Sequence, residues 1–174
     1  MRSLKFKLRR ESLNQICISF LRPILEYASV VWDNCTVAEK DSLEKIQHEA
    51  AHIVTGTTRS ITLNNLYNEI GWLSLADRRT YQKLVYTFNI INGLAPDYLC
   101  SIYPNAVSNR SQYPLRNALY IDTIARRIDI FAKSFIPSSV KLWNDLPPDV
   151  KPLQSLTLFK SKILQTFNAS KVPS

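Results

Sequence analysis

Glycine is scarce in this 174-residue chain, which contains only Gly56, Gly71 and Gly93. Gly-rich phosphate-binding loops need at least two glycines within a few residues, so these loops are excluded. The low count also argues against an all-β fold, because tight turns between strands draw on glycine for positive φ angles. The chain is 45% apolar and 21% charged, so it can bury a core as one compact domain or two small ones.

Residue types that carry catalysis are also few. No two acidic residues are adjacent, so the aspartate pair of a polymerase is missing from this sequence, and no G-x-S-x-G hydrolase motif occurs. Cys17, Cys35 and Cys100 lie too far apart for a zinc ribbon, and we interpret them as free packing thiols in a reducing, intracellular compartment. We therefore expect no catalytic residue, no metal site and no cofactor.

The two histidines, His48 and His52, stand four residues apart on a predicted helix, a spacing that can hold a metal. At 100° per residue, however, both fall opposite the apolar stripe of Leu43, Ile46 and Ala50. No cysteine or third histidine follows at ligand distance, and our interpretation is that the intervening residues do not form a metalloprotease motif. We interpret both as histidines that face solvent.

No apolar stretch approaches the roughly 20 residues that span a bilayer, so we expect no membrane partner. The basic start MRSLKFKLRR is followed by polar residues rather than by an apolar region, which argues against a signal peptide.

The net charge of +8 is distributed unevenly. Residues 1–10 carry +5, residues 11–77 carry −5 and residues 78–174 carry +8, a pattern that suits the backbone of RNA or DNA. A solvated surface that keeps the protein in solution is the alternative. The candidate phosphate contacts are the basic residues of the arm and of two later clusters: Lys5, Lys7, Arg9, Arg10, Arg79, Lys83, Arg126 and Arg127.

Two of these candidates depend on a helix-face argument. Arg79 and Lys83 are four residues apart and fall opposite the stripe of Leu84 and Phe88, so they are expected to present a small basic face. Arg78 lies at the edge of that stripe, where a structural ion pair is the better interpretation.

Apolar periodicity predicts a helix over residues 12–32, with a kink or a break at Pro23. Its expected core-facing stripe consists of residues spaced by three and four: Leu13, Ile16, Phe20, Ile24, Tyr27, Ala28 and Val31.

A second helix is predicted from a capping box at Thr36 and Glu39 to about Thr55, with Leu43, Ile46, Ala50, Ile53 and Val54 as its stripe. A shorter helix over 62–70 and a longer one from Ser74 to about Gly93 follow. The three glycines stand just after these three helical runs, where a left-handed cap is needed.

The second half is less regular. One or two helical turns are expected at 97–103 and a loop at 104–118; residues 134–145 and those after Ser155 fit helices. Residues 118–132 match strand and helix patterns equally well, and we favour a short hairpin or an extended segment there. The fold class is thus mainly α, an irregular domain of about five to seven helices with at most one short β-hairpin near 118–132.

Trp32, Trp72 and Trp143 could stack on unpaired bases, but all three stand at helix ends beside apolar residues. We interpret them as packing residues.

Seven segments occur in an order that resembles the region after the polymerase core in reverse transcriptases of jockey-like non-LTR retrotransposons. They are LRPILEYASVVWDNC (21–35), LEKIQHEAAHIVTG (43–56), GWLSLADRR (71–79), NGLAPDYL (92–99), YPLRNA (113–118), SFIPSSVKLWNDLP (134–147) and FKSKI (159–163). The ordered set is more specific than any single segment.

The resemblance implies a fragment of an RNA-directed DNA polymerase whose fingers and palm, with the catalytic aspartates, lie outside this chain. Charge and composition predict a basic arm at 1–11, a helical region at 12–103, a loop at 104–118, a C-terminal helical region at 119–168 and a frayed tail at 169–174. The resemblance implies that the region at 12–103 is thumb-like. Such a fragment would be non-catalytic, would support the thumb and would contact template RNA or target DNA. The alternatives are a stand-alone helical nucleic-acid-binding module and a protein-interaction piece whose 12–32 helix has lost its partner.

Overall fold

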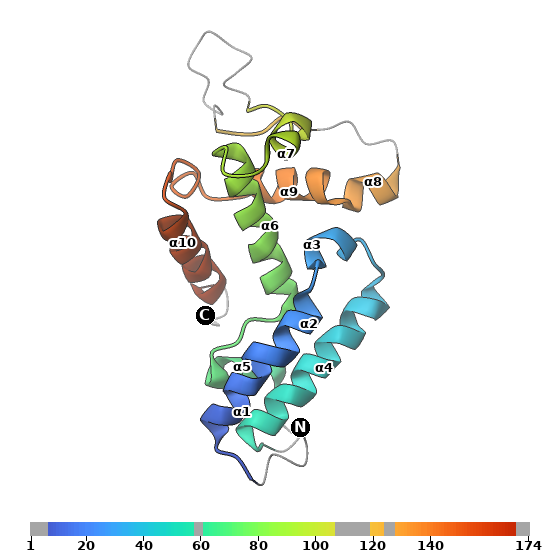
Figure 1. Ribbon diagram of the computed structural model, residues 1–174, viewed down its shortest axis with the longest axis vertical. Helices are drawn as coiled ribbons and strands as arrows, with labels where there is room; N and C mark the ends of the chain where they lie inside the picture. Colours follow the sequence, from blue (N-terminus) through green and yellow to red (C-terminus); the bar gives the residue numbers. More distant parts are fainter. Residues whose placement is uncertain (1–6, 58–60, 107–118, 124–127, 170–174) are drawn as a thin grey trace. The chain divides into compact units, whose positions relative to one another are not determined.

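The computed structural model describes residues 7–57, 61–106, 119–123 and 128–169. These residues are mainly helical, which confirms the predicted fold class (Figure 1). The chain forms two compact units, Met1–Arg79 and Thr80–Ser174, and the division falls inside helix α6 (Leu75–Ile91).

The first unit begins with a segment that was predicted as one helix and is instead divided into four. These are α1 (Arg10–Ile16), the π-helical turn η2 (Cys17–Leu21), α2 (Arg22–Glu26) and α3 (Ser29–Trp32). Pro23 has no N–H and would crowd the carbonyl four residues before it, and the wider π turn stands at that point. The chain breaks only later, at Ala28, whose φ of 50° is left-handed.

The buried face of this segment differs from the predicted one. Leu13, Cys17, Leu25 and Ser29 are buried, and with the half-buried Leu21 they form a row with one member every four residues. In a regular α-helix such a row drifts around the axis, because four residues exceed one turn of 3.6. A π turn holds more residues per turn, so it reduces that drift and keeps the row facing one side. The expected stripe of Phe20, Ile24, Tyr27 and Val31 is therefore wrong as a core face.

Helix α4 (Val37–Thr55) begins and ends as the sequence predicts. The Thr36 hydroxyl accepts from the Glu39 N–H, and the Glu39 carboxylate accepts from the Thr36 N–H at 2.8 Å. The helix ends at Gly56, whose φ of 72° is easy only for glycine. Its predicted stripe is partly wrong, because Ile46 is exposed and Gln47 is buried.

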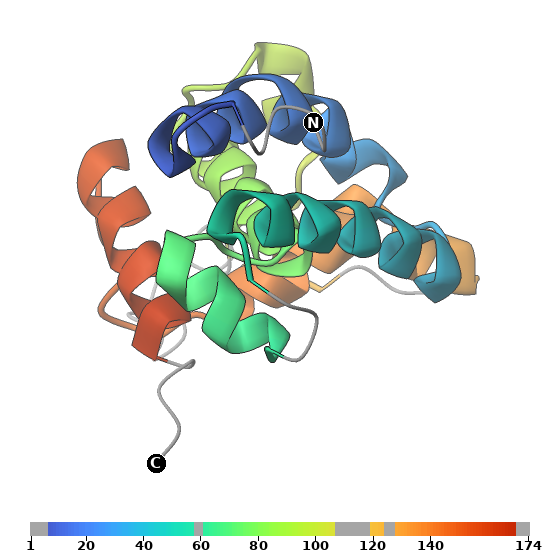
Figure 2. The same ribbon diagram turned by 90° about the horizontal axis from the view of Figure 1, so that it is seen from below.

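The core of the first unit forms between α1, η2, α4 and α5 (Leu63–Ile70), with α4 beside both α1 and α5 (Figures 1 and 2). Its buried members are mostly small or aliphatic: Leu13, Cys17, Ala50, Ala51, Val54, Leu66, Tyr67 and Trp72. Gln47 supports it by donating from its side-chain amide to the Leu73 carbonyl at 3.0 Å.

The second unit contains the rest of α6, then α7 (Asp97–Ile102), α8 (Asp129–Lys133), α9 (Phe135–Asn144) and α10 (Leu156–Ala169). Its core is rich in aromatic rings. The Phe159 ring lies 4.4 Å from that of Phe88 and 5.8 Å from that of Trp143, measured between centroids. The predicted turns at 97–103 and the helices near 134–145 and after Ser155 are confirmed.

The favoured hairpin near 118–132 is wrong for the part of that segment that can be compared. Ile121 makes an isolated antiparallel bridge with Ala106, and residues 129–133 form α8 instead of a returning strand. Asn144 holds Ile121 from the other side, since its amide group exchanges two hydrogen bonds of 3.0 Å with the Ile121 backbone. A side chain distant in sequence thus satisfies the backbone groups that a hairpin would have paired.

Over the residues that the structure describes, no helix is both long enough and apolar enough to cross a bilayer.

Candidate functional site

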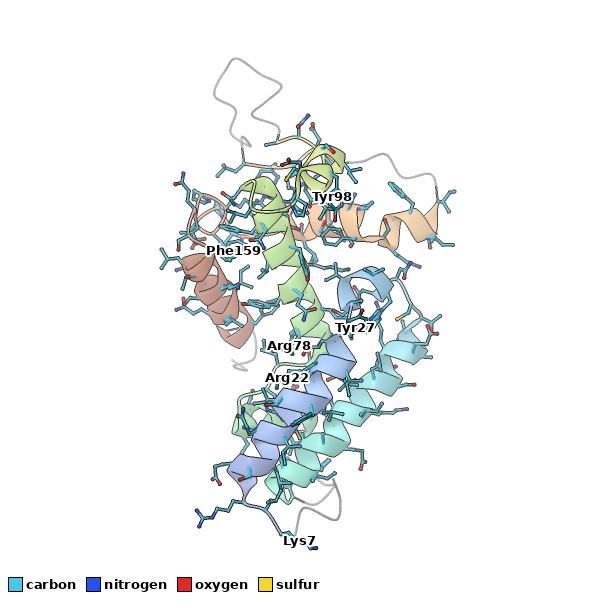
Figure 3. The ribbon with its side chains drawn as sticks, in the orientation of Figure 1. Lys7, Arg22, Tyr27, Arg78, Tyr98 and Phe159 are labelled. Atoms are coloured by element: carbon cyan, nitrogen blue, oxygen red, sulfur yellow. The ribbon has the colours of Figure 1, made fainter. Side chains whose placement is uncertain are left out.

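The basic candidates that the structure describes include both exposed and buried side chains. Lys5, Arg126 and Arg127 lie outside the described residues. Lys7 and Arg9 are exposed at the start of the first unit, where Figure 3 shows Lys7 beyond the end of α1. Arg10 is exposed as well, but its guanidinium pairs with the Glu69 carboxylate at 2.8 Å.

The expected basic face of Arg79 and Lys83 is wrong, because both side chains are buried. In the first unit, Arg79 Nε contacts Asp33 Oδ1 at 3.0 Å, and its guanidinium lies over the Trp32 ring. In the second unit, Lys83 Nζ donates to the Ser138 hydroxyl at 3.1 Å. The helix-face argument failed because polar partners on other elements cover the side of α6 that periodicity left to solvent.

The interpretation of Arg78 as an ion-pair residue is confirmed. Its guanidinium binds Glu26 through two nitrogens, with Nη2 at 2.8 Å from Oε2. Arg22 lies near the same carboxylate and against the Trp72 ring, and Figure 3 shows Arg22 beside Arg78. Burial, and then the positive charge of Arg78, lower the pKa of Arg22. Glu26 thus neutralises two cations, a role that the sequence analysis did not assign.

The three tryptophans pack as interpreted. Trp72 and Trp143 are buried. The indole N–H of Trp72 donates to Asn14 Oδ1 at 2.9 Å, and the indole N–H of Trp143 donates to the Leu119 carbonyl at 3.1 Å. The indole N–H of Trp32 donates to the Tyr27 carbonyl at 2.7 Å. All three cysteines are free thiols, and burial raises the pKa of Cys17.

The most unusual surface of the first unit consists of exposed apolar side chains on η2, α2 and α3 and on Tyr27, which follows α2. Phe20, Ile24, Tyr27 and Val31 are 70%, 75%, 80% and 77% exposed. We call these four residues the exposed stripe. Its members share the segment with the buried residues Leu13, Cys17 and Leu25, so the segment carries more apolar side chains than the first unit covers. The sequence signal was present, because apolar residues occupy most of the circumference between 13 and 31.

The histidines also differ from expectation. His52 is buried, His48 is half-buried, and their Nε2 atoms lie 2.9 Å apart. The interpretation that the intervening residues do not form a metalloprotease motif is wrong, because residues 48–52 read His-Glu-Ala-Ala-His, the H-E-x-x-H pattern of zinc metalloproteases. Those enzymes need a third protein ligand. Among the described residues, no group of three or more histidine, cysteine or acidic side chains could hold a metal ion.

No protein-family model, curated protein or solved structure matches this chain.

Proposed function

We propose that this chain is the helical region that follows the polymerase core in a non-LTR retrotransposon reverse transcriptase. It packs against the fingers–palm portion through the exposed stripe and supports the thumb without carrying catalytic groups. The ordered sequence segments suggest which protein is the partner, and the exposed stripe suggests which surface of this chain binds it.

The stripe supports this role because four large apolar side chains of the first unit are left exposed. Phe20 on η2 and Ile24 on α2 stand four residues apart in continuous helix, whereas Tyr27 follows α2 and Val31 lies on α3, beyond the break at Ala28. Moving such a side chain from water into an apolar site is worth about 1.5–3 kcal/mol. Burial of the four against a partner would therefore offset part of the free energy that association costs.

Association with a polymerase core tests the proposal. The full chain is mixed with the separately expressed fingers–palm domain of a jockey-type element, and binding is measured by sedimentation velocity. We expect a one-to-one complex that is weakened at least tenfold by the double substitution Ile24→Ser and Tyr27→Ser. Leu94→Ser, which changes an exposed apolar residue of the second unit, is the control and should have no effect. A complex that tolerates the double substitution would refute the role of the stripe.

Primer extension tests the non-catalytic part of the proposal. The purified chain, given Mg²⁺, a primed RNA template and deoxynucleotides, is expected to add no nucleotide. Extension by the chain alone would refute it, because nucleotide transfer requires converging metal-binding carboxylates.

A second candidate function is nucleic-acid binding by the arm, favoured by the exposure of Lys7 and Arg9. Each phosphate contact contributes about −0.9 to the slope of log affinity against log salt for duplex DNA. Lys7→Gln with Arg9→Gln should make that slope shallower by about 2. The matched pair Lys141→Gln with Lys162→Gln removes the same charge and should change affinity less. A salt-independent signal would leave no nucleic-acid role.

A further inference from the structure

The two histidines of α4 form a connected polar site whose hydrogens can be assigned. The Thr55 hydroxyl donates to the Ala51 carbonyl at 3.0 Å, so its single hydrogen is used. The 2.8 Å contact between Thr55 and Thr57 must then be donated by Thr57. The Thr57 oxygen is left as an acceptor, and it accepts from Nδ1–H of His52 at 3.2 Å.

This chain of bonds fixes the tautomer of His52. Since Nδ1 carries the hydrogen, Nε2 of neutral His52 has a free lone pair, and it points at Nε2 of His48. One proton therefore lies between the two Nε2 atoms. The backbone cap supports the arrangement, because Gly56 turns the chain so that Thr57 returns to His52.

We infer that His48 and His52 bind one divalent transition-metal ion through their Nε2 atoms, with Cu²⁺ and Ni²⁺ preferred over Zn²⁺. Binding requires that the single hydrogen of neutral His48 moves from Nε2 to Nδ1, so that both Nε2 lone pairs face the metal and no net proton is released. Among the described residues no third protein ligand completes the site, so water takes the remaining coordination positions.

The distance between the nitrogens supports this order of metals. If a metal lies about 2.05 Å from each of two nitrogens that are 2.9 Å apart, the N–metal–N angle is about 90°. That angle belongs to the square-planar or tetragonal sites of Cu²⁺ and Ni²⁺, whereas tetrahedral Zn²⁺ requires nitrogens about 3.3 Å apart. The general affinity order of nitrogen ligands for divalent metals also places Cu²⁺ above Ni²⁺.

Thr57 provides the outer contact that a metal-binding histidine normally has. Such a histidine usually donates its other ring N–H to an acceptor, which fixes the ring and the tautomer. His52 makes this bond without a metal, so the ligand is oriented before binding. This inference is independent of the proposed polymerase role, because it uses only α4 and the two residues that follow it.

Titration of the untagged full chain tests the inference. We expect one Ni²⁺ per chain by isothermal titration calorimetry, and a Cu²⁺ resonance spectrum with coupling to two imidazole nitrogens. These imidazoles belong to the site, because the chain has no other histidine. His48→Gln, at the half-buried ligand, should weaken Ni²⁺ binding at least tenfold. Circular dichroism should show that the variant retains its helices.

Two further variants make the test specific. Thr57→Val keeps the shape of the side chain but removes the acceptor for His52, and it should weaken Ni²⁺ binding about tenfold. Cys35→Ser with Cys100→Ser removes the partly exposed thiols and should leave binding unchanged. The inference is overturned if no Ni²⁺ binds, if His48→Gln binds within twofold of the parent chain, or if only the cysteine variant loses binding.

Discussion

The two units use different chemistry to hold their helices. The first has two aromatic rings among smaller and aliphatic core side chains, and adds ion pairs such as Arg78–Glu26 and Arg79–Asp33. The second stacks the rings of Phe88, Trp143 and Phe159 and has a buried polar contact between Tyr103 and Ser139. Burial of smaller side chains contributes less free energy than burial of aromatic rings, so substitutions should act differently in the two cores.

The largest effect is expected in the aromatic core. Phe159→Ala should lower the free energy of unfolding by about 3–5 kcal/mol, because the fully buried ring leaves a cavity. Leu158→Ala, at the exposed neighbouring position, should change it by less than about 0.5 kcal/mol. Urea denaturation gives both values, and equal losses would contradict the assignment of the core.

The same paired design applies to the buried row and the exposed stripe of the first unit. Leu25→Ala, on the buried row, should lower the free energy of unfolding by about 2–4 kcal/mol. Ile24→Ala, on the exposed stripe, should leave that free energy almost unchanged. Hydrogen exchange followed by mass spectrometry can confine the effect to the first unit. A larger cost for Ile24→Ala would mean that the predicted stripe is the core face after all.

Breaking the ion pairs should affect only the first unit. Glu26→Gln leaves Arg78 and Arg22 without their shared carboxylate in a partly buried place, and we expect a loss of about 2 kcal/mol. Asp129→Asn breaks the exposed pair with Lys133 in the second unit and should cost less than about 0.5 kcal/mol. Denaturation of both variants at low and high salt provides the comparison.

Alkaline pH should act on both units through buried tyrosines. Burial is the main cause that raises the pKa of Tyr67 in the first unit and of Tyr103 in the second. The folded state therefore keeps protons that the unfolded state loses near pH 10. Stability is complete below about pH 10 and falls above it, by up to about 1.4 kcal/mol per pH unit for each tyrosine.

Urea midpoints between pH 8 and 11.5 measure this fall. Tyr67→Phe and Tyr103→Phe should each make the dependence on pH shallower. Tyr27→Phe, at an exposed ring, should leave it unchanged. Stability that rises with alkaline pH would contradict the burial of these hydroxyls.

The smallest effect should be the same in both units. Gly71 and Gly93 have φ angles of 67° and 66°, and an added Cβ would meet no atom within 4 Å at either position. Replacing each by alanine should lower the free energy of unfolding, measured by urea denaturation, by about 1 kcal/mol through backbone strain alone. Unequal losses would show that something other than the left-handed backbone matters at one of the caps.

The sequence by itself determined where most helices begin and end. The Thr36–Glu39 box, the Ser74 cap that accepts from the Asp77 N–H and the left-handed glycines after the helices all act within a few residues, so local sequence is enough to place them. Part of the candidate site was predictable in the same way, since the spacing of His48 and His52 places both on one helix.

Tertiary structure decided which faces are buried. The π turn at 17–21 changed the phase of an apolar helix, so a core stripe in the sequence became the exposed stripe. Asp33 and Ser138 covered Arg79 and Lys83, although they stand 46 and 55 positions away in the sequence. Thr57 and the shared proton joined the two histidines into one site. Periodicity fixes an angle around a helix axis only while the helix is regular, and it contains no information about which distant side chain will cover that angle.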